Sequence, residues 1–299
     1  MIDNLSTLLN VFPLALVAGL VIAVTCAVLG VFVILKRVVF IGITLSEAAA
    51  CGIALAMVHH VHPFLGATAL TLATVCLLAY PFEARRIPRD AVLGALFVFT
   101  SALSVLLVSK SGFGLDEVKK LIYGDLILTS GSDLAVVLGA LLPVLACVLL
   151  FVRPTLYTFL DREGARVLGI RVVLWELLFF FALGVSVSAA SKVAGALLVF
   201  CYLVVAPSAG LLLSRRLGCV MVIAAAAAAG STLLGLLWSI ECDLPTNQSI
   251  AVITCGWFAA AAATTAVRAI PNRLRTMRKA AAAQTGEAAI APARPLHGR

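Results

Sequence analysis

Apolar runs of about twenty residues follow one another along this 299-residue chain, and they restrict its fold more than any other feature. Each run is long enough to cross a hydrocarbon core of roughly 30 Å as a helix. Within lipid, only helices and closed barrels satisfy their own backbone hydrogen bonds. The runs are continuous rather than alternating, which favours helices. With 63% hydrophobic and 12% charged residues, an ordinary soluble domain is excluded. We therefore predict an all-α, polytopic membrane helical bundle.

The sequence predicts about nine spans in one transmembrane domain over residues 1–268, followed by a flexible tail over residues 269–299. The polar segment 110–132 is too hydrophilic for a full crossing and predicts an interfacial or re-entrant helix. The nine spans lie near residues 11–35, 41–61, 64–80, 91–109, 133–152, 172–190, 193–213, 219–240 and 248–268.

Basic residues are distributed unequally between the two sides of this bundle. With the N-terminus outside, 18 of the 22 basic residues fall in inner loops or the tail, and only Lys110, Lys119, Lys120 and Lys192 fall outside. Because cytoplasmic loops carry the excess of Lys and Arg, we predict an outside N-terminus and a cytoplasmic C-terminus. Because the basic residues lie between the apolar runs and in the tail, the net charge of +8 does not indicate binding to nucleic acid.

Two further patterns limit the chemistry. The sequence contains no G-x-x-x-x-G-K-[S/T] motif, so active transport would need energy from a partner or from an ion gradient. None of the eight cysteines forms a C-x-x-C pair, and most lie in apolar runs, which predicts small packed thiols rather than a disulfide framework.

Glu47 is the most informative single residue, because a carboxylate in mid-membrane costs about 2.5–3.5 kcal/mol and usually faces a cavity or a partner. Cys51 lies one turn later on the same helical face. A carboxylate and a thiolate so placed can hold a divalent cation such as zinc. Alternatively, Glu47 is protonated or bonded to a neighbouring helix, and Cys51 only packs.

Other candidates lie near the predicted membrane surfaces. His59 and His62, with His60 between them, predict either a metal-collecting mouth on one helical face or a polar cap. Asp243, in the outer sequence ECDLPTNQ, either attracts cations or is ordinary solvated surface. Glu176, beside Trp175, is interpreted as an interfacial anchor.

Pro207 and Gly210 interrupt the seventh span. Proline removes a backbone hydrogen bond, and a broken helix exposes carbonyl groups that can line a transport path. We therefore predict a helix break at these residues, with a static packing kink as the alternative.

Four segments in order resemble one known family. They are VFVILKRVVFIGITLSEAAACGIAL, LIYGDLIL, DREGARVLGI, and GALLVFCYLVVAPSAGLLL followed by DLPTNQSIAVI. Together, over roughly residues 11–268, they resemble the permease subunits of ABC-type importers of zinc, manganese or iron(II). In that family the segment similar to DREGARVLGI docks on the ATPase. The resemblance thus implies coupling to an ATPase through Asp161, Arg162, Glu163, Arg166 and Gly169.

The resemblance carries further expectations. It implies a permease homodimer in the bacterial cytoplasmic membrane, with two ATP-binding subunits and an extracytoplasmic metal-binding protein. The chain itself would not be an enzyme, and the divalent metal would be substrate rather than a permanently bound cofactor. The family usually has Asp and, four residues later, His at the start of the second span. Here Ile43 and Glu47 occupy these positions, so the metal is left open.

Two other functions are compatible with parts of the sequence. A self-sufficient secondary carrier would use Glu47 as a proton or ion site, but such carriers often show internal repeats, and none is evident here. A membrane-embedded enzyme would need clustered His, Asp or Ser residues within the spans, where only scattered acids occur.

Overall fold

The computed structural model describes residues 12–78, 89–110, 124 and 126–267, and all regular structure in these residues is helical. The elements are α2 (Pro13–Leu35), α3 (Phe40–Val58), α4 (Pro63–Leu78), α5 (Arg89–Lys110), η2 (Leu126–Leu128), α7 (Gly131–Leu150), α8 (Val152–Leu160), α9 (Arg162–Val167), α10 (Val172–Leu213), α11 (Leu217–Cys242) and a last helix, Thr246–Val267. Most of segment 110–132 and the tail from 269 lie outside the described residues.

Seven helices in the described part of the chain are long and apolar enough to cross a membrane: α2, α3, α5, α7, α10, α11 and Thr246–Val267. Helix α4 is apolar but shorter, at 16 residues. The predicted helical membrane bundle is thereby confirmed.

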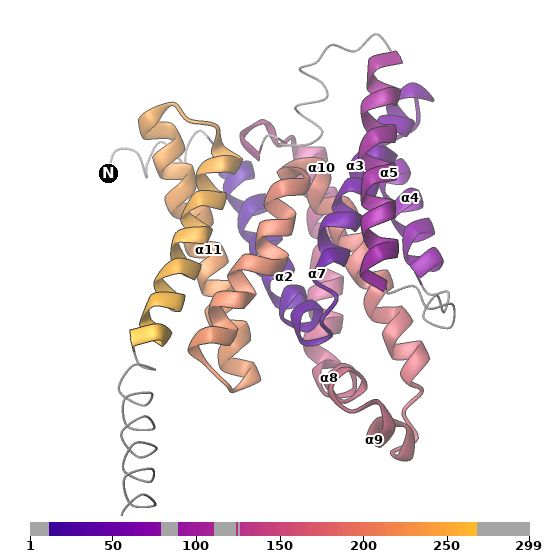
Figure 1. The fold of residues 1–299 in the computed structure, drawn as a ribbon. Helices are drawn as coiled ribbons and strands as arrows, with labels where there is room; N and C mark the ends of the chain where they lie inside the picture. The colour runs from indigo at the N-terminus through magenta and orange to yellow at the C-terminus, as the bar shows by residue number, and fades with distance from the viewer. Residues whose placement is uncertain (1–11, 79–88, 111–123, 125, 268–299) are drawn as a thin grey trace, which may run out of the picture.

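Helix α10 consists of two rods joined at Gly195. A straight helix of its 42 residues would be about 63 Å long, twice the thickness of a typical hydrocarbon core. Gly195 has φ 72° and ψ 163°, values that essentially only glycine adopts. In Figure 1 the first rod of α10 rises from α9 and the second rod descends again. The rods correspond to the sixth and seventh predicted spans.

Helices α2 and α3 form the centre of the bundle. Within their most apolar stretches 72% and 78% of the residues are buried, against 22%, 17% and 17% for α5, α7 and Thr246–Val267. Small residues permit this central packing. A Cβ added to Gly52 of α3 would overlap the backbone of Gly66 in α4, so only glycine allows the two helices to approach so closely.

The prediction of a helix break at Pro207 and Gly210 is wrong. Helix α10 continues through both residues to Leu213, and its non-helical residue is Gly195. Proline leaves the carbonyl of Leu203 without its helical N–H partner. Gly30 of α2 lies so close that an added Cβ would overlap this carbonyl oxygen and the Pro207 ring. Helix α2 thus packs directly over the proline turn.

Candidate functional site

Glu47 lies in the middle of the central helix. Glu47 is only 8% exposed, and its Oε2 atom makes no hydrogen bond with the described residues. Helix α3 packs here against α4, α5 and α10. One turn earlier the buried Thr44 hydroxyl lies 2.9 Å from the Phe40 carbonyl oxygen and 3.2 Å from that of Leu93 in α5. The carboxylate is therefore held inside the bundle rather than turned toward lipid.

Four buried hydroxyl groups in the same core also lack a hydrogen-bond partner among the described residues. They belong to Thr25 of α2, Ser46 of α3, and Ser186 and Ser191 of α10. Helix α10 packs against both α2 and α3. Because an unsatisfied buried polar group costs about 1–3 kcal/mol, such a set is typical of a site that binds or conducts a polar substrate.

The sequence analysis did not single out these hydroxyl residues. Serine in a membrane helix usually bonds to a carbonyl of its own helix, as Ser188 does to Gly184 at 2.7 Å. Ser186 and Ser191 occur in the same serine-rich stretch, yet they have no such bond. Only the packed structure separates the two kinds, so no signal in the sequence identifies them.

Cys51 is buried one turn after Glu47 on α3, as the helical spacing predicts. Together the two residues offer two donors, whereas zinc commonly takes four ligands. No group of three or more His, Cys, Asp or Glu residues is placed to hold a metal ion in the part of the chain that the structure describes. Any ion held by Glu47 and Cys51 would thus also need oxygen ligands such as hydroxyl groups, carbonyl groups or water.

The predicted common helical face for His59 and His62 is wrong. Helix α3 ends at Val58, His60 adopts a left-handed conformation with φ 56°, and α4 begins at Pro63. Proline disfavours a helical conformation in the residue before it, which separates the two helices. His59, His60 and His62 are all exposed in this connection.

Asp243 lies in the connection between α11 and the last helix. It is exposed and adopts the left-handed conformation that ends α11. Asn247, four residues later, is buried and donates a hydrogen bond from Nδ2 to the Ala194 carbonyl, at 3.0 Å. Because Gly195 interrupts the helix at this point, Asn247 supports the bend of α10. The DLPTNQ segment therefore positions a structural residue that the sequence analysis missed.

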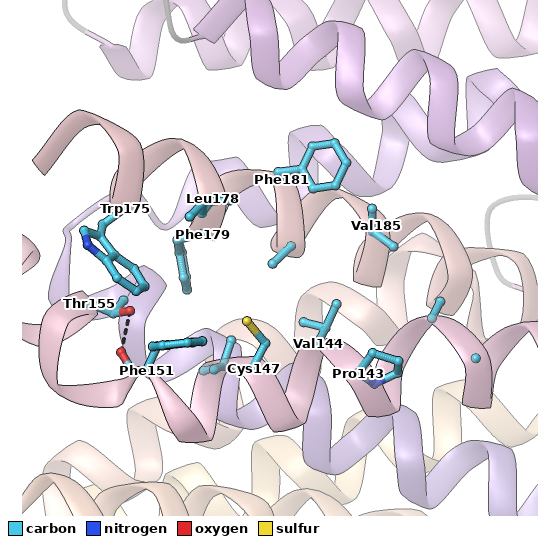
Figure 2. A pocket seen from close by; sticks show the side chains of 14 residues that line it. Pro143, Val144, Cys147, Phe151, Thr155, Trp175, Leu178, Phe179, Phe181 and Val185 are labelled. Carbon is cyan, nitrogen blue, oxygen red and sulfur yellow. Dashed lines mark hydrogen bonds between the residues drawn. The ribbon is translucent and has the colours of Figure 1, made fainter. Parts of the chain in front are cut away.

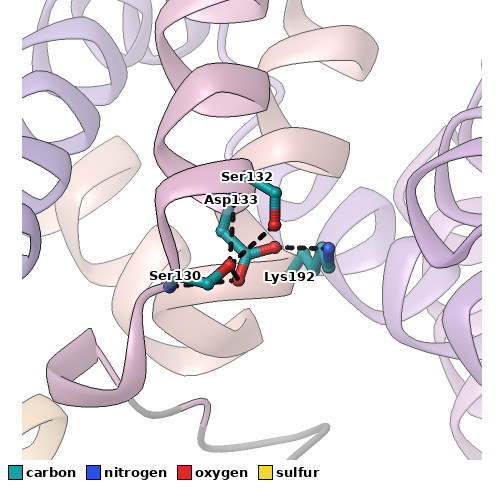
Figure 3. A network of polar contacts seen from close by, with 4 residues as sticks. All are labelled: Ser130, Ser132, Asp133 and Lys192. Atoms are coloured by element: carbon teal, nitrogen blue, oxygen red, sulfur yellow. Dashed lines mark hydrogen bonds and ion pairs between the residues drawn. The ribbon is translucent and has the colours of Figure 1, made fainter.

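A second polar network joins α7 to α10 close to the same bend (Figure 3). Lys192 Nζ lies 2.5 Å from Asp133 Oδ1. Asp133 also accepts a hydrogen bond from the Ser130 hydroxyl at 2.6 Å, within a capping box at the start of α7. Both charged side chains are about one-fifth exposed. The ion pair fixes the start of α7 beside the end of the first rod of α10, next to the bend.

The segment DREGARVLGI forms the short helix α9, which is followed by Gly169. The Asp161 side chain accepts a hydrogen bond from the Gly164 N–H at 2.9 Å and caps α9. Gly169 follows the helix with φ 76°. Val167 and Leu168 are 88% and 68% exposed, which leaves two apolar side chains uncovered on this projection. Glu163 and Arg166 are exposed beside them.

An aromatic cluster and an ion pair attach this projection to the bundle. Phe159 of α8 packs edge-on against Phe179 of α10, with ring centroids 4.9 Å apart. Lys36, just after α2, forms an ion pair with Glu176 and lies 4.6 Å from the Phe159 ring centroid. Glu176, interpreted from the sequence as an interfacial anchor, thus has a specific partner. The contacts join α8 to the ends of α2 and α10.

Comparison with known proteins now places this fold. Residues 9–265 match the profile of the ABC 3 transport family. The chain belongs to the ABC 3 transport family. The resemblance that the sequence motifs indicated is confirmed.

Two curated relatives illustrate the range of this ABC 3 group. The chain is 29% identical over 248 residues to the manganese transport system membrane protein MntC of Halalkalibacterium halodurans, covering 83% of this chain and 85% of that protein. It is 26% identical over 194 residues to the high-affinity zinc uptake system membrane protein ZnuB of Haemophilus influenzae, covering 65% and 74%.

A solved structure of PsaBC from Streptococcus pneumoniae in complex with Fab has the same fold as this ABC 3 protein. The match has a TM-score of 0.79 at 20% identity and covers 87% of this chain and 95% of that one.

Proposed function

We propose that this ABC 3 family member is the membrane-spanning permease subunit of an ATP-binding-cassette importer that moves divalent metal ions, zinc, manganese or iron, into the cell. The observation that carries the proposal is the buried Glu47 carboxylate, with one oxygen unpartnered among the described residues. A cation passing through the bundle would relieve the cost of such a group. Relatives named as manganese and zinc transport proteins support the choice of substrate.

The proposed topology has nine spans in the bacterial cytoplasmic membrane, with the N-terminus outside and the C-terminus in the cytoplasm. Counting the two rods of α10 separately, and including α4, is consistent with this number. The predominance of basic residues in the proposed inner loops supports the orientation. In this topology α9 lies on the cytoplasmic side, and the bend at Gly195 lies on the outer side.

The proposed partners follow from the two ends of the bundle. An ATP-binding subunit would dock on α9, where Val167 and Leu168 are exposed, and would hydrolyse ATP on its own chain. An extracytoplasmic metal-binding protein would deliver the ion to the opposite end. Two copies of the permease would form the working unit. The chain itself would catalyse no reaction and would carry the metal only as substrate.

The test is metal uptake into vesicles that contain the permease with its ATPase, comparing zinc, manganese and iron(II). We expect uptake of at least one ion that requires ATP hydrolysis. A secondary carrier, the other candidate, would instead accumulate the ion without the ATPase when a proton or sodium gradient is imposed. Gradient-driven uptake by the permease alone would overturn the proposal.

A further inference from the structure

A groove runs between α7 and the first rod of α10 (Figure 2), and none of its lining residues belongs to α3, which carries Glu47. Its volume is about 510 Å³. The lining side chains are almost entirely apolar, and the Thr155 hydroxyl is already bonded to the Phe151 carbonyl at 2.8 Å. Cys147 is the one thiol in this lining, and a single thiol among apolar side chains is no metal site, so the groove suits a hydrocarbon chain.

The length of the groove matches one leaflet of a bilayer. It extends from Gly139 of α7 to Phe151, the residue that follows this helix, which corresponds to on the order of 18 Å along the helix axis. Half of a typical hydrocarbon core is ~15 Å thick. A Cβ added to Gly139 would meet open space, so the groove is unfilled at its deep end. It therefore accommodates an acyl chain that enters from one surface and ends near mid-membrane.

The other end of the groove lies at the surface where α8 and α9 are found. Phe151 and Trp175 face each other there, with ring centroids 5.2 Å apart. Tryptophan is enriched at membrane–water interfaces, which marks this end as the headgroup level. Arg153 lies between the lining residues Phe151 and Thr155, and Arg171 precedes Trp175 by one turn. Both arginines are exposed.

The charges around this end favour an anionic headgroup. The nearest carboxylate in sequence, Glu176, is paired with Lys36. Asp161 lies at the far end of α8, where it caps α9. Arg153 and Arg171 are exposed and lie within four residues of lining residues at this end, so they place positive charge beside the apolar groove, where a phosphate can be bound.

We propose that this groove binds one acyl chain of an anionic phospholipid, whose headgroup phosphate is held by Arg153 and Arg171. The lipid belongs to the leaflet on the α8–α9 side, which is the cytoplasmic leaflet if the proposed orientation holds. The binding itself does not depend on the transport function.

Fluorescence quenching of Trp175 tests the proposal directly. In a Trp238→Phe, Trp257→Phe variant, Trp175 is the remaining tryptophan of the chain. The protein is placed in vesicles of phosphatidylcholine that contain a small fraction of one brominated lipid. This lipid is either phosphatidylglycerol or phosphatidylcholine, and in both cases the bromine atoms lie near the headgroup end of the acyl chains. We expect brominated phosphatidylglycerol to bind about 30-fold more strongly than brominated phosphatidylcholine, because each of the two arginines attracts the anionic headgroup.

Variants separate the two parts of the site. Arg153→Gln with Arg171→Gln should remove the preference for phosphatidylglycerol while quenching persists. Ala182→Phe, in the middle of the groove, should reduce quenching by both lipids. Ala226→Phe, at an exposed position on α11, is the matched control and should not.

Two results would overturn the proposal. Equal quenching by the two brominated lipids in the parent would exclude headgroup selection. Absence of quenching, together with oxidative cross-linking of the groove residue Cys147 between two copies, would show that a second copy of the chain covers the groove. Neither result bears on metal uptake, so failure here is distinguishable from failure of the proposed transport function.

Discussion

Glu47 combines an acidic side chain, nearly complete burial and an oxygen without a partner among the described residues. A carboxylate serving only the fold would be expected to have a bonded partner, as Asp133 has in Lys192. An uncompensated acid within a membrane protein instead marks a functional position. At the residue scale, this is the position where substitution should separate folding from transport.

We predict that Glu47→Gln inserts and folds at least as well as the parent but lowers the initial rate of metal uptake by about tenfold or more. The amide keeps the size of the side chain and removes both its insertion cost and its charge. Uptake by vesicles, normalised to protein amount, measures the effect. Glu241→Gln is the matched control, because Glu241 is exposed at the end of α11. Normal uptake by Glu47→Gln would show that the carboxylate is structural.

Cys51→Ser should lower uptake less than Glu47→Gln does, because the hydroxyl keeps the size but loses the soft thiolate. If the two residues share one ion, the double variant should lose less than the product of the two single losses. The same vesicle assay on all four proteins measures this coupling. Independent, multiplicative losses would place Cys51 outside the site.

At the scale of elements, the bend in α10 depends on one glycine and on what surrounds it. Gly195 supplies the dihedral angles, and Asn247 binds the carbonyl of Ala194. Gly124 packs so closely against the bend that a Cβ added to Gly124 would overlap the backbone of Gly195. The bend is therefore a packed corner between two rods.

Gly195→Ala should destabilise the protein by about 1–3 kcal/mol, because alanine is strained at φ 72° and ψ 163°. For a chain of this size, the apparent melting temperature in detergent should fall by about 2–12 °C. Gly230→Ala is the control, since Gly230 is helical and an added Cβ meets open space. It should leave the melting temperature unchanged or raise it. An unchanged melting temperature for Gly195→Ala would contradict this account of the bend.

Helix α9 projects from the lower end of the bundle (Figure 1) and exposes Val167. Val167→Asp should reduce copurification of the ATPase by about tenfold or more, because a charge would replace an apolar contact in the proposed docking surface. Val61→Asp makes the same change at an exposed position in the α3–α4 connection, at the opposite end, and should not. Equal ATPase recovery with both variants would exclude α9 as the docking site.

Gly169→Asp tests the same surface through the backbone. Gly169 has φ 76° and ends α9, and no neighbour would meet an added side chain. We expect the variant to insert normally but to lose ATPase binding or the coupling of hydrolysis to uptake. Full transport with normal ATPase recovery would contradict the assignment of this segment.

At the scale of the whole molecule, the proposed orientation places the start of α11 on the cytoplasmic side and its end on the outer side. In a variant with no other cysteines, Arg216→Cys should react with a membrane-impermeant maleimide only from the cytoplasmic side. Native Cys242, retained alone, should react only from outside. Both positions are exposed, and they lie at opposite ends of the helix. Labelling of Arg216→Cys from outside in intact cells would contradict the nine-span topology.

The sequence by itself determined that the chain is a helical membrane bundle, where most helices begin and end, and which family it resembles. These properties follow from the length of apolar runs, from turn residues and from short motifs. The capped helix α9 was predictable for the same reason, because Asp161 and Gly169 act on their own local backbone.

Only the tertiary structure decided which polar groups lack partners and where α10 bends. Pro207 looked like the break, but its helix is continuous and lies in close contact with Gly30. The bend is at Gly195 instead, where Asn247 binds the preceding carbonyl group. Likewise Ser186 and Ser188 differ in bonding although they are two residues apart. Such outcomes depend on contacts between segments far apart in the chain, and local sequence carries no information about which helix packs against which residue.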